Sequence, residues 1–463
     1  MNAHRTGAGL RGWLDRRYQL TPLIEFLRHK QVPLGPHSLA WYYLGGVTLF
    51  FFCVQVVTGA LLLMYYQPGE ATAYESIRFL TTKVPFGWLM RSVHSWSAQL
   101  MIFSLVLHMF STMLLKAYRP PRELTWVSGY VLFALTLGFG FSGYLLPWNG
   151  LSYFATTVGT NLVRSVPLVG NWCLQVLRGG PDVTINTLYR FFAIHVVILP
   201  LVFVGWISLH LLFVQRQGMA LPLGAKVAPR GMKFFPSFAV RDLLLWLACF
   251  MVLLTLAVFA PYGPGIPGMD WELGEKANPM APAYPGIKPE WYFLWEYQLL
   301  REFPPHIFGL EGPQVCLLLI VALLGLWAVI PWLDRRAGRD KPSPVFTDFG
   351  WAAILFLTFL TLMGWDIGAG AVSAGPGSMP AVAARCAWWT LASGGVVIGV
   401  RFLAGGSRWF ILTGAALLQA ALHGLGGIPY LPAGVIAAAL AAIALAALAL
   451  GRRRSEPAAG GPS

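Results

Sequence analysis

Four histidines inside two long apolar segments constrain the fold of this chain more than any other feature of its sequence. His94 and His108 lie 14 residues apart in one segment, and His195 and His210 lie 15 residues apart in the other. At ~100° and ~1.5 Å per residue of an α-helix, each pair returns to nearly the same face, roughly 21–22 Å apart along the axis. Two such helices side by side would form two levels, and a haem with two axial imidazoles fits each level.

The ordinary alternative to haem ligands is that these histidines are hydrogen-bonded polar residues inside a helix bundle. For a single histidine, that alternative would be favoured. Ionisable groups are rare and costly in segments that cross a membrane. Four histidines at matched intervals therefore favour metal ligands.

Glycine gives a second, independent signal at the same interval. Gly45 and Gly59 are 14 residues apart in one apolar segment, and Gly129 and Gly143 are 14 apart in another. A haem face needs a close backbone without a side chain. Glycine also serves as a packing position in membrane helices, but two pairs in register with the histidines favour the haem interpretation.

The composition is typical of a polytopic membrane protein, since 56% of the 463 residues are hydrophobic and only 11% are charged. The expected fold is an all-α membrane helix bundle of about ten transmembrane helices with a four-helix dihaem core. The expected spans are residues 40–66, 92–115, 124–147, 191–214, 243–262, 313–333, 349–365, 386–400, 409–428 and 431–451.

The formal charge of +14 reflects sidedness and is no nucleic-acid signature. If every span crosses, most Lys and Arg residues fall on the side of the N-terminus. This bias predicts cytoplasmic N- and C-termini for a multi-pass protein. The expected location is a bacterial inner membrane. His94 and His195 would then lie near the outer face, and His108 and His210 deeper toward the cytoplasm.

The five cysteines form no C-x-x-C or C-x-x-C-H group. Their spacing argues against an iron–sulfur cluster or an ordinary covalent haem within this chain.

Several motifs resemble cytochrome b of the quinol-oxidising cytochrome bc complexes over about residues 20–370. They are Arg91-Ser-Val-His94-Ser-Trp, Pro121-Arg-Glu-Leu-Thr-Trp126, Gly143-Tyr-Leu-Leu-Pro-Trp148, Arg190-Phe-Phe-Ala-Ile-His195 and Pro289-Glu-Trp-Tyr292. The second histidine interval resembles the split-chain form of chloroplasts and cyanobacteria. This chain, however, continues without a break into the segment that is a separate subunit there.

The resemblance implies that His94 and His195 hold a low-potential outer b haem, and that His108 and His210 hold a high-potential inner one. Split-chain relatives carry a cysteine for a third, covalent haem in a Tyr-Cys-Leu-Gly-Gly run. Here the run is Tyr42-Tyr-Leu-Gly-Gly46, so we expect no covalent haem on this chain.

Arg91 and Arg190 stand three and five residues before His94 and His195. Each is either a snorkelling anchor at the membrane boundary or a bidentate partner of a haem propionate. The sequence leaves both interpretations open.

The resemblance makes Pro289–Tyr292 the signature of the quinol oxidation site, with Glu290 as proton acceptor and Tyr292 and Tyr144 as neighbouring proton-carrying groups. The alternative for Glu290 is a cap of the helix that opens at Trp291. Arg241 and Asp242 resemble the pair that delivers protons at the inner quinone site, although a simple salt bridge is an equally good interpretation.

The implied protein is the catalytic cytochrome b subunit of a quinol–cytochrome c reductase, a proton-translocating membrane complex. Its expected partners are a Rieske iron–sulfur protein, a c-type cytochrome or equivalent acceptor, quinone and lipid, in a dimeric complex without nucleic acid. We expect a dihaem domain over residues 1–230, a subunit IV-like domain over 231–370 and an extra transmembrane extension over 371–463. The competing classes are a ten-span transporter and the haem anchor of a membrane dehydrogenase.

Overall fold

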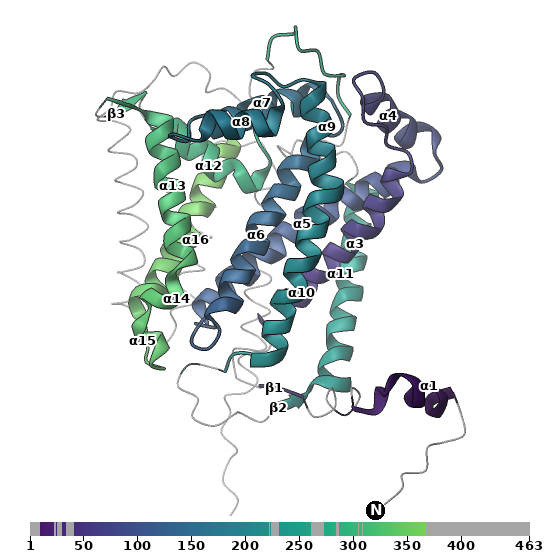
Figure 1. Cartoon of the computed structure of the whole chain (residues 1–463), viewed down its shortest axis with the longest axis vertical. Helices are drawn as coiled ribbons and strands as arrows, with labels where there is room; N and C mark the ends of the chain where they lie inside the picture. Colours follow the sequence, from purple (N-terminus) through teal and green to yellow (C-terminus); the bar gives the residue numbers. More distant parts are fainter. Residues whose placement is uncertain are drawn as a thin grey trace, which may run out of the picture.

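The computed structural model describes residues 10–366, except for 23–24, 26–29, 34–40, 222, 224–230, 261–272, 284–286, 304 and 308. Figure 1 shows long helices running along the longest axis of the molecule. The last three expected spans, and the whole expected extension over 371–463, lie outside the described residues.

Four long helical units form the part of the bundle that carries the histidines. They are α3 (Leu44–Leu63, preceded by the turn η1 at Trp41–Tyr43), α5 (Gly87–Leu114), α6 (Glu123–Tyr144) and the continuous unit α9 (Ile185–Ala193), η2 (Ile194–Ile198) and α10 (Leu199–Gln217). Helix α3 packs on α5, and α6 packs on α10. These four units and a fifth, Phe234–Phe259, are long and apolar enough to cross a membrane.

The fifth unit comprises the short turn η3 (Phe234–Phe238) and α11 (Ala239–Phe259), which packs on α5 and α3. Its outward residues Leu243, Leu244, Leu247 and Met251 are each more than half exposed. A row of exposed apolar side chains of this kind is suited to lipid.

The sixth and seventh expected spans correspond to α13 (Gly312–Ala328) and α16 (Pro344–Asp366). Helix α12 (Trp291–Glu302) packs between them. The short helices α14 (Ile330–Leu333) and α15 (Arg335–Gly338) connect α13 to α16.

The two ends of the bundle carry different short elements (Figure 1). One end carries α4 (Ala73–Lys83), α7 (Gly150–Arg164), α8 (Gly170–Arg178) and the strands β3 (His306–Ile307) and β4 (Leu310–Glu311). The opposite end carries α1 (Leu10–Tyr18) and the antiparallel strands β1 (Gln31–Pro33) and β2 (Gly231–Lys233), where Val32 pairs with Met232.

Helix α7 begins at Gly150. The cause is a capping box, in which the Asn149 side chain accepts a hydrogen bond from the Ser152 amide at 2.8 Å. The Asn149 side chain also donates to the Leu273 carbonyl at 2.8 Å, and the Gly150 amide donates to the Glu275 carbonyl at 2.9 Å. These bonds fix the chain that leads toward α12 against the start of α7.

A π-helical turn interrupts the helix that carries His195 and His210. The turn η2 spans Ile194–Ile198 and contains His195 itself. A π-bulge inserts one residue into an α-helix without ending it. The interval of 15 in this helix therefore behaves as an interval of 14, and the two histidine pairs come into register.

A buried polar cluster connects the loop between α5 and α6 to the junction between α14 and α15. Asp334, only 1% exposed, accepts hydrogen bonds from the Tyr118 hydroxyl at 2.7 Å and the Ala337 amide at 3.1 Å, and lies 4.0 Å from the Lys116 ammonium. Burial lowers the pKa of Lys116 to about 8, although the charges of Asp334 and Asp348 oppose that change. The carboxylate is thus the common partner of three buried donors.

We predict that Asp334→Ala destabilises the protein by about 3 kcal/mol, because it leaves a buried ammonium and a buried hydroxyl without their acceptor. Lys116→Met keeps both hydrogen bonds to Asp334 and should cost less. The Tm of the purified variants measures both effects. Equal Tm values for Asp334→Ala and the wild type would contradict the prediction.

Candidate functional site

The four histidines meet in two pairs, one at each of two levels in the bundle. His94 of α5 lies within electrostatic reach of His195 of η2, and His108 of α5 lies within reach of His210 of α10. These are the partners that the two-level interpretation expects. Each level has one imidazole from each of two helices.

Each imidazole lies against one of the four spaced glycines. The distance from an ideal Cβ to the Cε1 atom of the facing ring is 3.3 Å for Gly45 and His108, 3.4 Å for Gly59 and His94, 3.2 Å for Gly129 and His210, and 2.6 Å for Gly143 and His195. A methyl group at these positions would press on the ring. The glycines therefore allow the backbones of α3 and α6 to approach the imidazoles closely.

Hydroxyl groups contact the Nδ1 atoms of three of the four imidazoles. The oxygen–nitrogen distances are 2.8 Å for Thr58 and His94, 2.8 Å for Ser128 and His210, and 3.1 Å for Ser142 and His195. Each hydroxyl also donates to a backbone carbonyl of its own helix, at 2.7 Å to Val54, 2.8 Å to Thr125 and 2.7 Å to Gly138.

These contacts decide the tautomer of the three rings. A hydroxyl has one proton to donate, and the carbonyl receives it, so the hydroxyl oxygen accepts from the imidazole. The hydrogen is then on Nδ1, and Nε2 keeps a lone pair for a metal. Three of the four rings are thus held as metal ligands are held.

Sequence reasoning missed these hydroxyl residues, although a signal was present. Thr58, Ser128 and Ser142 each stand directly before one of the spaced glycines. The fourth glycine, Gly45, follows Leu44 instead. Accordingly, Nδ1 of His108 has no hydrogen-bond partner among the residues that the structure describes.

The two levels fit haem better than a bare metal ion. Within the described part of the chain, no group of three or more His, Cys, Asp or Glu side chains is placed to hold a metal. Haem brings four nitrogen ligands of its own and needs only two axial imidazoles. A pair of facing rings and a close glycine backbone at each level meet that need.

A carboxylate, an amide and two phenols come together near the α7 end. Glu290 precedes α12 and is 9% exposed, and its carboxylate oxygen accepts a hydrogen bond from Gln99 of α5 at 3.0 Å. Burial raises the pKa of Glu290 to about 8, and the Gln99 hydrogen bond opposes that change. Tyr292 lies within electrostatic reach of both Glu290 and Tyr144, and burial raises its pKa well above the usual range.

Glu290 occupies the N-cap position of α12, but its side chain makes no capping hydrogen bond. The carboxylate is directed to Gln99 instead. Gly140 of α6 leaves room for Tyr292, since a Cβ there would lie 2.5 Å from the phenolic oxygen. The arrangement is a buried carboxylate whose pKa is raised by burial, a state in which a carboxyl group can exchange a proton near neutral pH.

The two arginines expected beside the outer histidines have different surroundings. Arg91 is half-buried on α5, one turn before His94. Arg190 is exposed and donates hydrogen bonds to the carbonyl oxygens of Gln175, at 3.1 Å, and Val176 near the end of α8. In this structure the Arg190 side chain therefore connects α9 to α8 by hydrogen bonds.

At the opposite end of the bundle, Asp242 of α11 lies against α3. A Cβ at Gly46 would be 2.7 Å from a carboxylate oxygen of Asp242, so a side chain there would require the carboxylate to move. Tyr43 lies within electrostatic reach of Asp242 and Arg241, and its ring stacks on Phe238 at 4.4 Å between centroids. The Arg241–Asp242 pair is thus next to a phenol that the sequence did not single out for this site.

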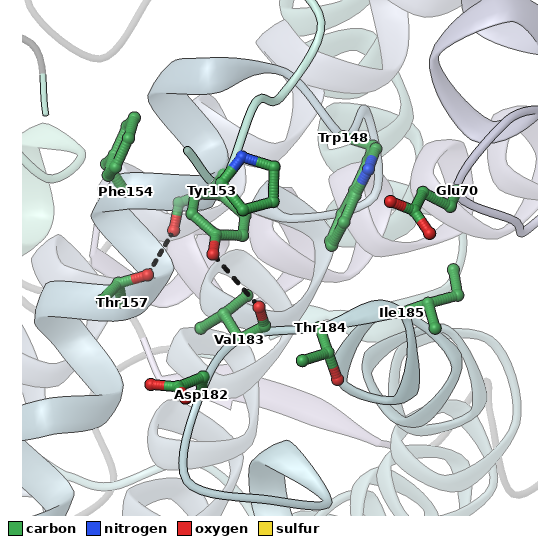
Figure 2. Close-up of a pocket in the computed structure, with 10 residues that line it drawn as sticks. Glu70, Trp148, Tyr153, Phe154, Thr157, Asp182, Val183, Thr184 and Ile185 are labelled. Carbon is green, nitrogen blue, oxygen red and sulfur yellow. Dashed lines mark hydrogen bonds between the residues drawn. The ribbon is translucent and has the colours of Figure 1, made fainter. Parts of the chain in front are cut away.

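An open cavity of about 550 Å³ lies beside α7, and Figure 2 shows its lining. Trp148 and Tyr153 form its aromatic wall, and Glu70 and Asp182 contribute carboxylates. The Tyr153 hydroxyl donates to the Val183 carbonyl at 3.2 Å. The residues that line it include none of the candidate ligands or proton-carrying groups, so this cavity is separate from the histidine levels, the Glu290 cluster and the Asp242 region.

Comparison with known proteins agrees with the motifs. Residues 29–218 match the family model described as Cytochrome b/b6/petB, and residues 276–374 match the one described as Cytochrome b(C-terminal)/b6/petD. The chain is 48% identical over 357 residues to a cytochrome bc complex cytochrome b subunit of Chlorobaculum thiosulfatiphilum. The match covers 76% of this chain and 79% of the relative.

Two further proteins match over different lengths of the chain. The chain is 41% identical over 211 residues to cytochrome b6 of Synechococcus sp. (strain JA-3-3Ab). The match covers 46% of this chain and 97% of the relative. A chain of a solved hyperthermophilic respiratory Complex III matches with a TM-score of 0.68 and 27% identity, over 84% of this chain and 95% of its own length.

We predict that Gly143→Ala removes one haem, because its methyl group would lie 2.6 Å from His195 and displace the ring. Gly205→Ala is the matched control, since a Cβ at Gly205 meets nothing within 4 Å. Haem content per polypeptide should fall to about half in Gly143→Ala and stay unchanged in Gly205→Ala. Full haem content with an unchanged spectrum in Gly143→Ala would show that the close approach is not needed.

Proposed function

Since this chain belongs to the cytochrome b family of the cytochrome bc complexes, we propose that it is the catalytic subunit of a quinol–cytochrome c reductase. As a cytochrome b, it is an integral membrane subunit of a quinol-oxidising complex, with two b haems bound through histidines and quinone as substrate. The observation that supports quinol oxidation by this subunit is the buried Glu290 carboxylate, which makes no capping hydrogen bond and lies beside Tyr292 and Gln99.

His94 and His195 would hold the low-potential haem, and His108 and His210 the high-potential one. The facing rings, the four close glycines and the Nδ1 hydrogen bonds support this assignment. When bound, the two haems supply the electron carriers between the two ends of the bundle. Arg91 is the better placed of the two arginines for a propionate, because it is half-buried one helical turn before His94, whereas Arg190 is exposed and directed to α8.

Glu290 would accept a proton from quinol at the outer side. A base must be ionised to accept a proton, and the raised pKa of Glu290, about 8, sets where that condition is met. Tyr292 and Tyr144 extend from Glu290 toward α6 and would share the proton transfer.

At the inner side, Asp242 and Arg241 would serve the quinone that receives electrons. The support is the Asp242 carboxylate against Gly46 and the adjacent Tyr43. Proton release at the outer side and uptake at the inner side would generate the proton gradient.

The proposed setting is a bacterial inner membrane with both termini cytoplasmic, in a dimeric complex. A Rieske iron–sulfur protein and a c-type cytochrome, or an equivalent acceptor, would be the partners. The cationic bias of the loops on one side supports the orientation. The membership in the cytochrome b family supports the partners, because one electron of the quinol must leave at the outer side.

We predict that His108→Ala or His210→Ala removes the inner haem and leaves the outer one, because the two levels use different residues. Redox-resolved visible spectra of the purified protein would show one low-spin b haem instead of two. Retention of both haems with unchanged spectra would refute the ligand assignment.

We predict that Glu290→Gln retains both haems but slows quinol oxidation by roughly 10²-fold or less, the range for loss of a general base. The amide keeps the size of the side chain and cannot accept the proton. Wild-type turnover should rise with pH through about 8, as Glu290 ionises, and this rise should vanish in the variant. A normally assembled Glu290→Gln protein with wild-type turnover across that pH range would make the carboxylate structural.

A further inference from the structure

The side chain of Gln99 joins the helix that carries two histidines to the start of α12. Its amide nitrogen donates to a carboxylate oxygen of Glu290 at 3.0 Å, and its amide oxygen accepts from the Trp291 indole nitrogen at 2.6 Å. Gln99 and Glu290 are each 9% exposed. Both polar ends of one buried amide are therefore used by two consecutive residues of the quinol-site motif.

The indole fixes which way the amide points. An indole N–H can only donate a hydrogen bond, so the group facing Trp291 must be the amide oxygen. The amide nitrogen of Gln99 then faces Glu290 and can only donate. A donor placed on a carboxylate stabilises its ionised form and restrains its rotation.

We propose that Gln99 is a positioning residue for quinol oxidation, whose amide donates to the Glu290 carboxylate and holds it in one orientation, with the amide itself fixed by the Trp291 indole. The inference rests on the proposed role of Glu290 as proton acceptor. Gln99 touches neither the quinol nor a haem in this scheme. It acts through Glu290.

The amide is the polar contact that opposes the burial of this carboxylate. The titratable groups around Glu290 are the Tyr292 phenol of α12 and, beyond it, the Tyr144 phenol of α6, while Lys288 stands two residues earlier. From α5, the contact is the neutral amide of Gln99. Removal of the amide leaves the desolvation of Glu290 unopposed by this hydrogen bond, so its pKa rises further.

The test is the pH dependence of quinol oxidation by the intact complex carrying Gln99→Leu, which keeps side-chain bulk and loses both hydrogen bonds. The rise of turnover with pH should move upward by about one pH unit, the shift expected for loss of one charge-assisted hydrogen bond. Gln99→Glu should move it at least as far, because an ionised carboxylate cannot donate and repels Glu290. Trp291→Phe frees the amide to rotate and should give a smaller shift in the same direction.

Ser97→Ala is the matched control on the same helix. Its hydroxyl is buried and donates to the Phe51 carbonyl at 3.1 Å, away from Glu290. A general loosening of α5 would move the pH profile in this variant as well. An unchanged profile in Ser97→Ala beside a shifted one in Gln99→Leu, with equal haem content, supports the positioning role.

Infrared spectroscopy gives a readout that does not depend on turnover. The carboxylic C=O band of Glu290 is identified by its loss in Glu290→Gln, and its titration should move upward in Gln99→Leu. If Glu290→Gln slows turnover but neither the band nor the profile moves in Gln99→Leu, the inference on Gln99 is wrong and the proposed function stands. If Glu290→Gln turns over at the wild-type rate, the proposed role of Glu290 fails first.

Discussion

The close approach of two helix backbones to four imidazole rings is the constraint on which the dihaem part of the molecule depends. The rings reach within van der Waals contact of glycines on α3 and α6, and a single methyl group at Gly143 would overlap His195. This contact decides which helices are neighbours and how they are rotated. It also places the hydroxyl residues that precede three of these glycines beside the ring nitrogens.

The two histidine levels differ in the hydrogen bonds that their imidazole rings make. Both imidazoles of the His94–His195 level donate to a hydroxyl, whereas at the other level His210 does so and His108 has no partner among the described residues. A hydrogen bond to the far nitrogen makes an imidazole a more basic ligand. The levels therefore differ in the basicity of their ligands as well as in their position.

The C-terminal helices pack on this bundle through a buried apolar cluster that includes Phe110, Trp126 and Ile330, and a few buried polar contacts accompany it. Asp334 binds Tyr118 at one end, and Gln99 binds Glu290 near the other. In an apolar medium every unsatisfied polar group is costly, so such contacts select one arrangement of the helices. The same contacts bring the buried carboxylate of α12 to the helix that holds His94 and His108.

The histidine and glycine intervals, the apolar spans and the motif around Glu290 were sufficient to predict the helical membrane fold, the family and its two b haems from the sequence. The helical fold and the two histidine levels follow from helix periodicity and from the cost of polar groups in lipid, which act locally along the chain. The family and its b haems follow from the resemblance of the motifs. Only the tertiary structure decided three further points. A π-turn at Ile194–Ile198 compensates for the extra residue between His195 and His210. Arg190 is directed to α8. Gln99 contacts Glu290, 191 positions away in the sequence. Side-chain contacts between distant segments leave no periodic pattern, because packing and not local spacing creates them.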